Sequence, residues 1–283
     1  MTSLKRRLDM SNIRKLFTNK GSTASYALLT AVFTVVPEDC FLIWKLCDKW
    51  KDSTNALINR LIACVAIFII ANIIYTIWRK NRKEVQVTGD NFAIQIEYGD
   101  LLKIPTGKVV INFDECFTTK VGASPADIKP TSVCGQYLAT HPITSMQELI
   151  ENAGIKPAKG KSEYNNQTRY TPGTIIPREQ FFLMAFAKLD KNGRGYLDYK
   201  DYLDCLNTLW EQIDLYHGTN DVYIPILGSN ITYFERQLTQ QELLDIMVSS
   251  YILNPKRMKN PCKLHIICRK RNGFLLDDVK GID

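Results

Sequence analysis

The stretch EYGDLLKIPTGKVVINFDECF, residues 97–117, contains the end of one apolar strand, a turn and a second apolar strand. Gly99-Asp100 follows the first strand, and Asn112-Phe113-Asp114-Glu115 follows the second, which we place at 108–111. Open α/β sheets bind ligands at the loops beyond the carboxyl ends of their strands. This stretch therefore predicts a sheet with polar, ligand-facing residues at one edge.

Strands and helices alternate through the rest of the chain after residue 83. Predicted strands lie at 84–87, 92–98, 108–111, 174–176, 181–189, 222–226 and 263–268. Predicted helices lie at 145–152, 199–216 and 239–251, the last opening with the capping box Thr239-Gln240-Gln241-Glu242. The polar segment 156–170 is predicted to be a mobile loop. This alternation implies an α/β fold whose central sheet is covered on both faces.

A third polar loop follows the predicted strand at 222–226, with the sequence PILGSNIT at 225–232. Gly228 would let a ligand approach the backbone closely, and successive N–H groups could hold a diphosphate. The carboxylate of Asp100 could accept hydrogen bonds from an adenine amino group or a ribose hydroxyl. Each signal is weak alone, because Gly-Asp pairs usually form ordinary turns.

An uninterrupted apolar segment, LIACVAIFIIANIIYTIW at 61–78, predicts a membrane-spanning helix. It carries no charge, and as a helix it covers roughly 27 Å, close to the ~30 Å hydrocarbon core of a bilayer. Tyr75 and Trp78 lie near its end, where aromatic rings favour the membrane interface. We place this span at about 58–78. A buried core helix is the alternative, but a core helix of this length would normally carry a polar face.

A shorter apolar run predicts a first span at about 21–36. A helix continued through Pro37-Glu38-Asp39 would place two carboxylates near the bilayer centre, at about 2.5–3.5 kcal/mol each. A cleaved signal peptide is the competing interpretation, although no small-residue cleavage site follows the run. Residues 1–20 form either an ordinary basic flank or an amphipathic helix on the membrane surface.

The formal net charge of +7 is concentrated beside these apolar runs. Lys and Arg are frequent on both outer flanks and sparse in the connecting segment, which predicts two cytoplasmic termini and contact with anionic lipid rather than nucleic acid. Eight cysteines without a CxxC pair fit reduced thiols rather than a disulfide or zinc framework. We divide the chain into a basic cytoplasmic flank (1–20), a transmembrane hairpin (21–78), a basic linker (79–90) and a soluble domain (91–283).

Residues 190–201 imitate an EF-hand calcium loop. Arg194 places a cation where an oxygen ligand is needed, and Asp201 replaces the usual bidentate glutamate. The preceding segment is typical of a strand, so we favour a turn, with a calcium-responsive module as a distant alternative. The three histidines are isolated in sequence, and neither a metal site nor a catalytic triad can be assembled from them.

Several sequence blocks, taken in order, resemble a known family. They are EYGDLLKIPTGKVVINFDECF, TSVCGQ, YTPGTIIP, FFLMAFAKLDKNGRGYLDY, VYIPILGSNITYF and TQQELLDIMVSSYIL. With the apolar hairpin and essentially all of 84–283, the chain resembles the membrane-anchored macro-domain effectors of type II Thoeris antiphage defence systems. The resemblance implies a two-helix transmembrane hairpin followed by a three-layer α/β/α macro domain with a mixed sheet.

The resemblance also implies a ligand site. Asp100 matches the aspartate that contacts adenine, Asn112 matches the asparagine that faces the distal ribose, and 228–232 matches the diphosphate loop. Phe274, after the last strand, would stack on adenine. The full set is Asp100, Leu101, Asn112, Gly228, Ser229, Asn230, Ile231, Thr232 and Phe274. Two departures, the absence of a NAAN-like sequence at 112–115 and an asparagine at 230 where glycine is common, favour ligand sensing over hydrolysis.

The resemblance implies a defence function in the bacterial inner membrane. A partner TIR-domain enzyme would make histidine–ADP-ribose from NAD. The macro domain would bind this signal without a cofactor or catalysis, and would then drive homo-oligomerisation, membrane disruption and abortive infection. The alternative is a membrane-anchored ADP-ribosyl hydrolase, for which Asp114 and Glu115 are the nearest candidates to position a water molecule.

Overall fold

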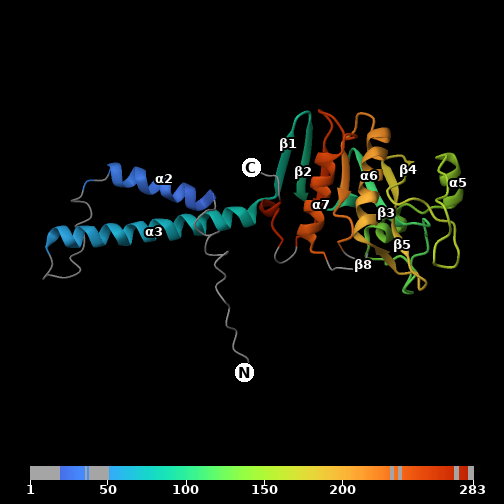
Figure 1. Cartoon of the computed structure of the whole chain (residues 1–283), viewed down its shortest axis with the longest axis horizontal. Coiled ribbons are helices and arrows are strands. Elements are labelled where there is room, and N and C mark those ends of the chain that lie inside the picture. Colours follow the sequence, from blue (N-terminus) through green and yellow to red (C-terminus); the bar gives the residue numbers. More distant parts are fainter. Residues whose placement is uncertain are drawn as a thin grey trace, which may run out of the picture. The chain divides into compact units, whose positions relative to one another are not determined.

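The computed structural model describes residues 20–35, 37, 51–229, 233–234, 238–270 and 274–279. The chain divides into two compact units, Met1–Arg82 and Lys83–Asp283 (Figure 1). The basic flank expected at 1–20 lies outside the described residues except for its last residue, and so does most of the segment that connects the two expected spans.

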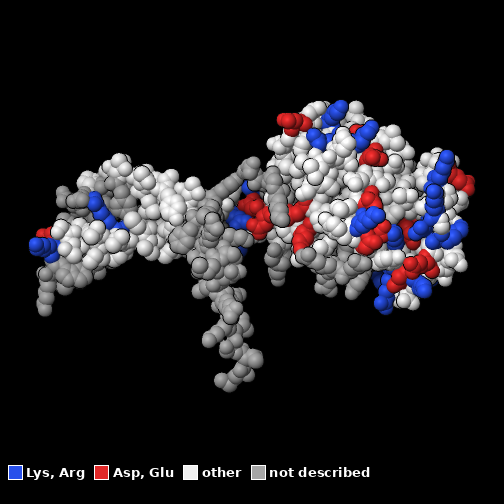
Figure 2. All heavy atoms as spheres, viewed as in Figure 1, with Lys and Arg blue, Asp and Glu red and all other residues white. Residues whose placement is uncertain are grey.

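The described part of the first unit contains two helices, α2 (Lys20–Val35) and α3 (Asp52–Asn81). They pack antiparallel, because Ser22 Oγ lies 3.4 Å from Asn72 Oδ1 and the Tyr26 ring lies 6.1 Å from the Phe68 ring. The side chains of α3 that face away from α2 are large, apolar and about half exposed, as at Ile69. Figure 2 shows few charged atoms over this unit and many over the other.

Among the described helices, α3 is the one that is long and apolar enough to cross a membrane, judged by length and composition. It begins at Asp52 rather than at residue 58, so the expected span lies inside a longer helix. Arg79 and Lys80 in its last turn favour the negative end of the helix dipole. The 16 residues of α2 are fewer than a perpendicular span usually needs. The first span, expected at about 21–36, stays a prediction.

The second unit alternates strands and helices, as predicted. The described strands are β1 (Glu84–Gly89), β2 (Phe92–Tyr98), β3 (Lys108–Asp114), β4 (Ile175–Arg178), β5 (Phe181–Leu189), β6 (Gly195–Leu197), β7 (Val222–Pro225), β8 (Tyr233–Phe234) and β9 (Leu264–Cys268). The described helices are η2 (Leu101–Lys103), α4 (Val133–Thr140), α5 (Met146–Asn152), α6 (Tyr199–Tyr216), α7 (Gln240–Leu253) and η3 (Leu276–Asp278). Residues 79–90, expected as a linker, contain the end of α3 and all of β1.

The described strands form one mixed sheet in the order β1-β2-β9-β7-β3-β5-β6-β8, with β4 also paired to β5. The five strands β2, β9, β7, β3 and β5 run parallel to one another. Strand β1 runs antiparallel to β2, and both β4 and β6 run antiparallel to β5, whereas β8 runs parallel to β6. All five parallel strands therefore end at the same edge of the sheet.

Helices cover both faces of this sheet. The side chains of β5 alternate, so that Phe182 and Met184 pack in a cluster with α6 and α7, whereas Phe181 and Leu183 pack with α4 and α5. On the first face, Trp210 is fully buried and its indole N–H donates to Ser250 Oγ at 3.0 Å, which joins α6 to α7. The three-layer α/β/α architecture with a mixed sheet is confirmed.

Candidate functional site

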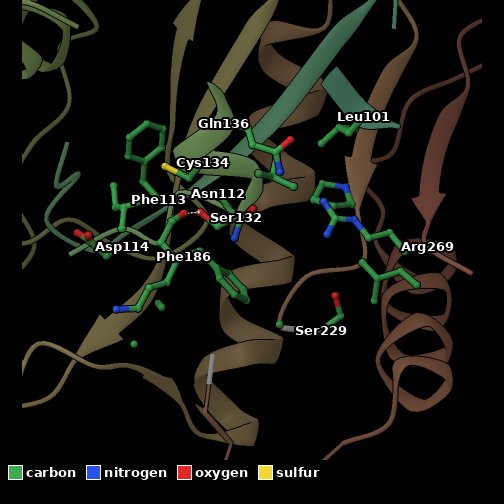
Figure 3. Close-up of a pocket in the computed structure, with 18 of the residues that line it drawn as sticks. Leu101, Asn112, Phe113, Asp114, Ser132, Cys134, Gln136, Phe186, Ser229 and Arg269 are labelled. Atoms are coloured by element: carbon green, nitrogen blue, oxygen red, sulfur yellow. Dashed lines mark hydrogen bonds between the residues drawn. The ribbon is translucent and has the colours of Figure 1, made fainter. Parts of the chain in front are cut away.

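A cavity of about 460 Å³ opens at the edge where the parallel strands end (Figure 3). Residues at or just after the carboxyl ends of β2, β9, β7, β3 and β5 line it, together with the segment 125–136 and the first residue of α7. The edge predicted from 97–117 is thus the edge that holds the cavity. Because the strands are parallel, loops distant in sequence meet there.

Asp100 lies at the mouth of the cavity, directly after β2. One carboxylate oxygen accepts a hydrogen bond from the Leu102 N–H at 3.2 Å, and the other lies 3.4 Å from Lys103 Nζ. The side chain is still 52% exposed, so it can accept a further hydrogen bond from a ligand. Leu101, also predicted for the site, is buried and forms part of the apolar wall.

Asn112 projects from β3 and also lines the cavity. Its side chain is half-buried, and its amide makes no hydrogen bond with any other residue that the structure describes. Phe113 and Ile111 point to the opposite face, where they join the cluster beneath α4. The amide of Asn112 therefore offers both a donor and an acceptor to a ligand.

Asp114 ends β3 and lines the cavity, but its carboxylate already has partners. A single oxygen, Oδ1, accepts from the N–H groups of Cys116 at 2.8 Å and Thr118 at 3.2 Å, which fixes the turn after the strand. Burial raises the pKa of the Asp114 carboxyl above its ordinary value, and these hydrogen bonds only partly oppose the rise.

We predict that Asp114→Asn reduces the pH dependence of folding stability. Because the pKa of the Asp114 carboxyl is higher in the folded than in the unfolded state, folding favours the protonated carboxyl. The stability that this carboxyl contributes is fully present below about pH 4 and is lost as pH rises through the folded-state pKa. An asparagine Oδ1 can keep both hydrogen bonds without a buried charge. Urea unfolding at several pH values should show that the free energy of unfolding of the variant rises relative to that of wild type between about pH 4 and pH 7. Asp204→Asn, an exposed carboxylate on α6, serves as the control; a constant difference for Asp114→Asn would contradict the prediction.

Glu115, the second candidate for positioning water, lies away from the cavity. It is buried, and its Oε1 accepts from Ser162 Oγ at 2.6 Å and from the Leu189 N–H at 3.2 Å. The guanidinium of Arg169 lies 3.8 Å from Oε2. These contacts attach the loop 156–170, predicted as mobile, to the end of β5. Glu115 is therefore a structural carboxylate.

The loop after β7 supplies the cavity wall expected to hold a diphosphate. Leu227 anchors its start, because the Tyr202 hydroxyl donates to the Leu227 carbonyl at 3.3 Å and the Leu227 N–H donates to Met247 Sδ at 3.4 Å. Gly228 has a φ of 80°, a left-handed conformation that glycine adopts without strain. Gly228 and Ser229 line the cavity. The other three predicted residues of this loop, Asn230, Ile231 and Thr232, lie outside the described residues.

The amino end of α4 forms part of the wall on the β3 side of the cavity. Ser132 caps this helix, since its Oγ accepts from the Gly135 N–H at 3.0 Å and donates to the Lys129 carbonyl at 2.7 Å. The sequence did not lead us to predict α4, because a glycine and a β-branched residue lie in its first turn. The serine cap was the available signal. Burial raises the pKa of the neighbouring Cys134 thiol, which keeps it protonated.

The loop that imitates an EF-hand forms another part of the wall. Asp190 Oδ1 accepts from the N–H groups of Asn192 and Arg194, both at 2.8 Å, and so organises a turn between β5 and β6. A Cβ on Gly193 would lie only 2.4 Å from the Ala126 Cβ, so this turn and the segment 125–129 are in close contact. Within the described residues, no group of three or more His, Cys, Asp or Glu side chains could hold a metal ion.

Phe274 is not at the predicted position. Its side chain is buried and packs edge to face against Tyr98, with ring centroids 6.0 Å apart, and its carbonyl accepts from the Tyr98 hydroxyl at 3.3 Å. It does not line the cavity. Burying a large apolar ring in the core is favourable. The residue that lines the cavity directly after β9 is Arg269, which was not predicted from the sequence.

Comparison with known families matches residues 94–269 to the family described as Thoeris protein ThsA, Macro domain. This match spans more than half of the chain. The chain belongs to the ThsA macro domain family. The matched residues run from β2 to the residue after β9, and they include every strand end that lines the cavity.

Among curated proteins, the chain is similar to the Thoeris protein ThsA of Bacillus amyloliquefaciens (strain Y2). The two are 27% identical over 227 residues, which cover 75% of this chain and 73% of that protein. Among solved structures, it is similar to an Oceanobacillus iheyensis macrodomain mutant with ADPR, at 12% identity and a TM-score of 0.45, covering 69% of this chain and 92% of the other. The same macrodomain with ADP gives 11% identity, a TM-score of 0.37 and coverage of 69% and 90%.

Proposed function

We propose that this ThsA-family chain is an antiphage defence effector whose macro domain binds an ADP-ribose signal in the cavity at the strand ends. The observation that carries the proposal is the convergence of Asp100, Asn112 and Gly228-Ser229 on one cavity. Its volume of about 460 Å³ lies within the range of pockets that bind small ligands.

Three groups along this edge of the sheet suit the adenine, the diphosphate and the distal ribose of such a ligand, in that order. The exposed carboxylate of Asp100 can accept from the adenine amino group. The glycine turn after β7 can bring backbone N–H groups to the diphosphate, as anion-binding loops do. The uncommitted amide of Asn112 can bind the hydroxyls of the distal ribose. A histidine–ADP-ribose made by a TIR-domain enzyme is the specific signal that we propose.

The proposed role is recognition without catalysis. Hydrolysis would need a carboxylate or another base free to activate water beside the distal ribose. The Asp114 carboxylate holds the turn after β3, and Glu115 is buried against Ser162 and Leu189. These contacts support ligand sensing over the alternative, a membrane-anchored ADP-ribosyl hydrolase.

We further propose that α2 and α3 anchor the macro domain in the bacterial inner membrane. The apolar, uncharged stretch of α3 and its half-exposed outer side chains support contact with lipid. A ligand that binds an assembled state more tightly than the monomer would shift the protein toward that state. Clustering of the helices would then disturb the bilayer.

The test is calorimetry on the full chain in detergent, with ADP-ribose and histidine–ADP-ribose as ligands. Asp100→Ala and Asn112→Ala should each weaken binding by about tenfold, because each removes a hydrogen bond worth about 1–1.5 kcal/mol. Asp204→Ala, an exposed carboxylate on α6, should bind as wild type does. Absence of heat with both ligands would refute ADP-ribose recognition, and ligand recovered in cleaved form would refute the non-catalytic role.

A further inference from the structure

Arg269 occupies a central position at the edge of the sheet. It directly follows β9, which lies between β2 and β7, so it is placed between the loop of Asp100 and the loop of Gly228. Figure 3 shows its side chain extending from the strand end toward the space between Leu101 and Ser229. Its backbone is fixed, because the Arg269 carbonyl accepts from Gln240 Nε2 at 3.1 Å at the start of α7.

The guanidinium of Arg269 makes no hydrogen bond or ion pair with another residue that the structure describes. The cavity's other described cation, Lys129, is engaged differently. Its ammonium donates to the carbonyls of Ala123 at 3.1 Å and Ser124 at 2.7 Å, which holds its own loop. Of the cations that line the described cavity, Arg269 is thus the one whose charge is available to a ligand.

The carboxylates that line the cavity do not neutralise Arg269. Asp100 pairs with Lys103, Asp127 pairs with Lys120 at 3.1 Å, and Asp114 accepts from two backbone N–H groups. An arginine fork binds the oxygens of a phosphate in a bidentate manner and keeps its charge at every physiological pH. The uncompensated positive charge therefore favours a ligand with phosphate groups at this position.

We propose that Arg269 is a specificity-determining residue that binds the diphosphate of the ligand, alongside the backbone of the loop after β7. This inference rests on the proposed function and deepens it. It makes the site selective for adenine nucleotides that carry a diphosphate over nucleosides that share the same base and ribose. It also assigns a side-chain charge to a position where sequence reasoning placed only backbone N–H groups.

The experiment measures binding of ADP-ribose, ADP and adenosine to the full chain in detergent. Arg269→Ala should weaken ADP-ribose and ADP by about 10- to 100-fold and leave adenosine unchanged, because only the first two carry phosphate. Arg269→Lys should recover part of the loss, since it restores the charge without the fork. Raising the salt concentration should weaken wild type more than Arg269→Ala.

Lys270→Ala is the matched control, because it removes the same charge from the next residue. The Lys270 ammonium lies 5.4 Å from the centre of the Tyr98 ring and does not line the cavity, so this variant should bind all three ligands as wild type does. An equal loss of adenosine in Arg269→Ala would indicate stacking on the base and overturn the inference, as would unchanged binding of ADP. Failure of wild type to bind any of the three would instead refute the proposed function itself.

Discussion

Placing arginine at both Ile69 and Ile73 is expected to remove the chain from the membrane. Both side chains lie near the middle of the uncharged part of α3, and both are about half exposed, at 51% and 53%. On the insertion scale each change costs about 3–4 kcal/mol at the centre of a span, so the pair costs about 6–8 kcal/mol. The double variant should leave the membrane fraction that resists alkaline carbonate extraction.

The control places the same two charges near the ends of the helix, in Leu57→Arg with Trp78→Arg. These side chains are similarly exposed, at 58% and 54%, but arginine near a helix end can extend its charge to the membrane interface. The control should therefore stay in the membrane. Equal retention of both double variants would show that α3 does not span a bilayer at this position.

Glu115→Ala is expected to lower the melting temperature of the macro domain by about 6–12 °C. The substitution leaves Ser162 Oγ and the Leu189 N–H without their acceptor, and it leaves Arg169 without its partner. Unsatisfied buried groups cost about 1–3 kcal/mol each, so a total near 3 kcal/mol is expected. In a domain of this size, each kcal/mol shifts the melting temperature by about 2–4 °C.

Thermal unfolding followed by circular dichroism checks this expectation. Glu163→Ala removes an exposed carboxylate from the same loop and should change the melting temperature by only about 1 °C. If Glu115→Ala had the same melting temperature as wild type but abolished turnover of an ADP-ribosylated substrate, Glu115 would be catalytic and the structural role assigned to it would be wrong.

Local sequence patterns were sufficient to predict most of this fold. The alternation of apolar strands with capped helices located the main strands of the sheet and helices α5, α6 and α7, because each has a strong local signal. The convergence of Asp100, Asn112 and Gly228 followed from a single rule, since residues after parallel strands meet at one edge. That rule needs only approximate strand ends. The end of β3 was predicted at 111, but the strand continues to Asp114, so Asn112 lies within the strand and not after it.

Other features depended on contacts that no local pattern encodes. The short strand β6 and helix α4 are stabilised by the body of the domain rather than by their own propensity. Phe274 and Arg269 both follow β9, and sequence order alone cannot decide which one enters the cavity. Packing decides it, because the phenyl ring gains more by burial against Tyr98 than by facing solvent.

The parallel strand ends have a consequence for how the domain responds to occupancy. The first wall of the cavity follows β2 and the last follows β9, so the two walls come from opposite ends of the matched domain. A bound ligand that contacts both walls links them non-covalently. It therefore couples the opening of loops that can otherwise open independently. The ligand, and not the polypeptide itself, would then make the opening of these loops cooperative.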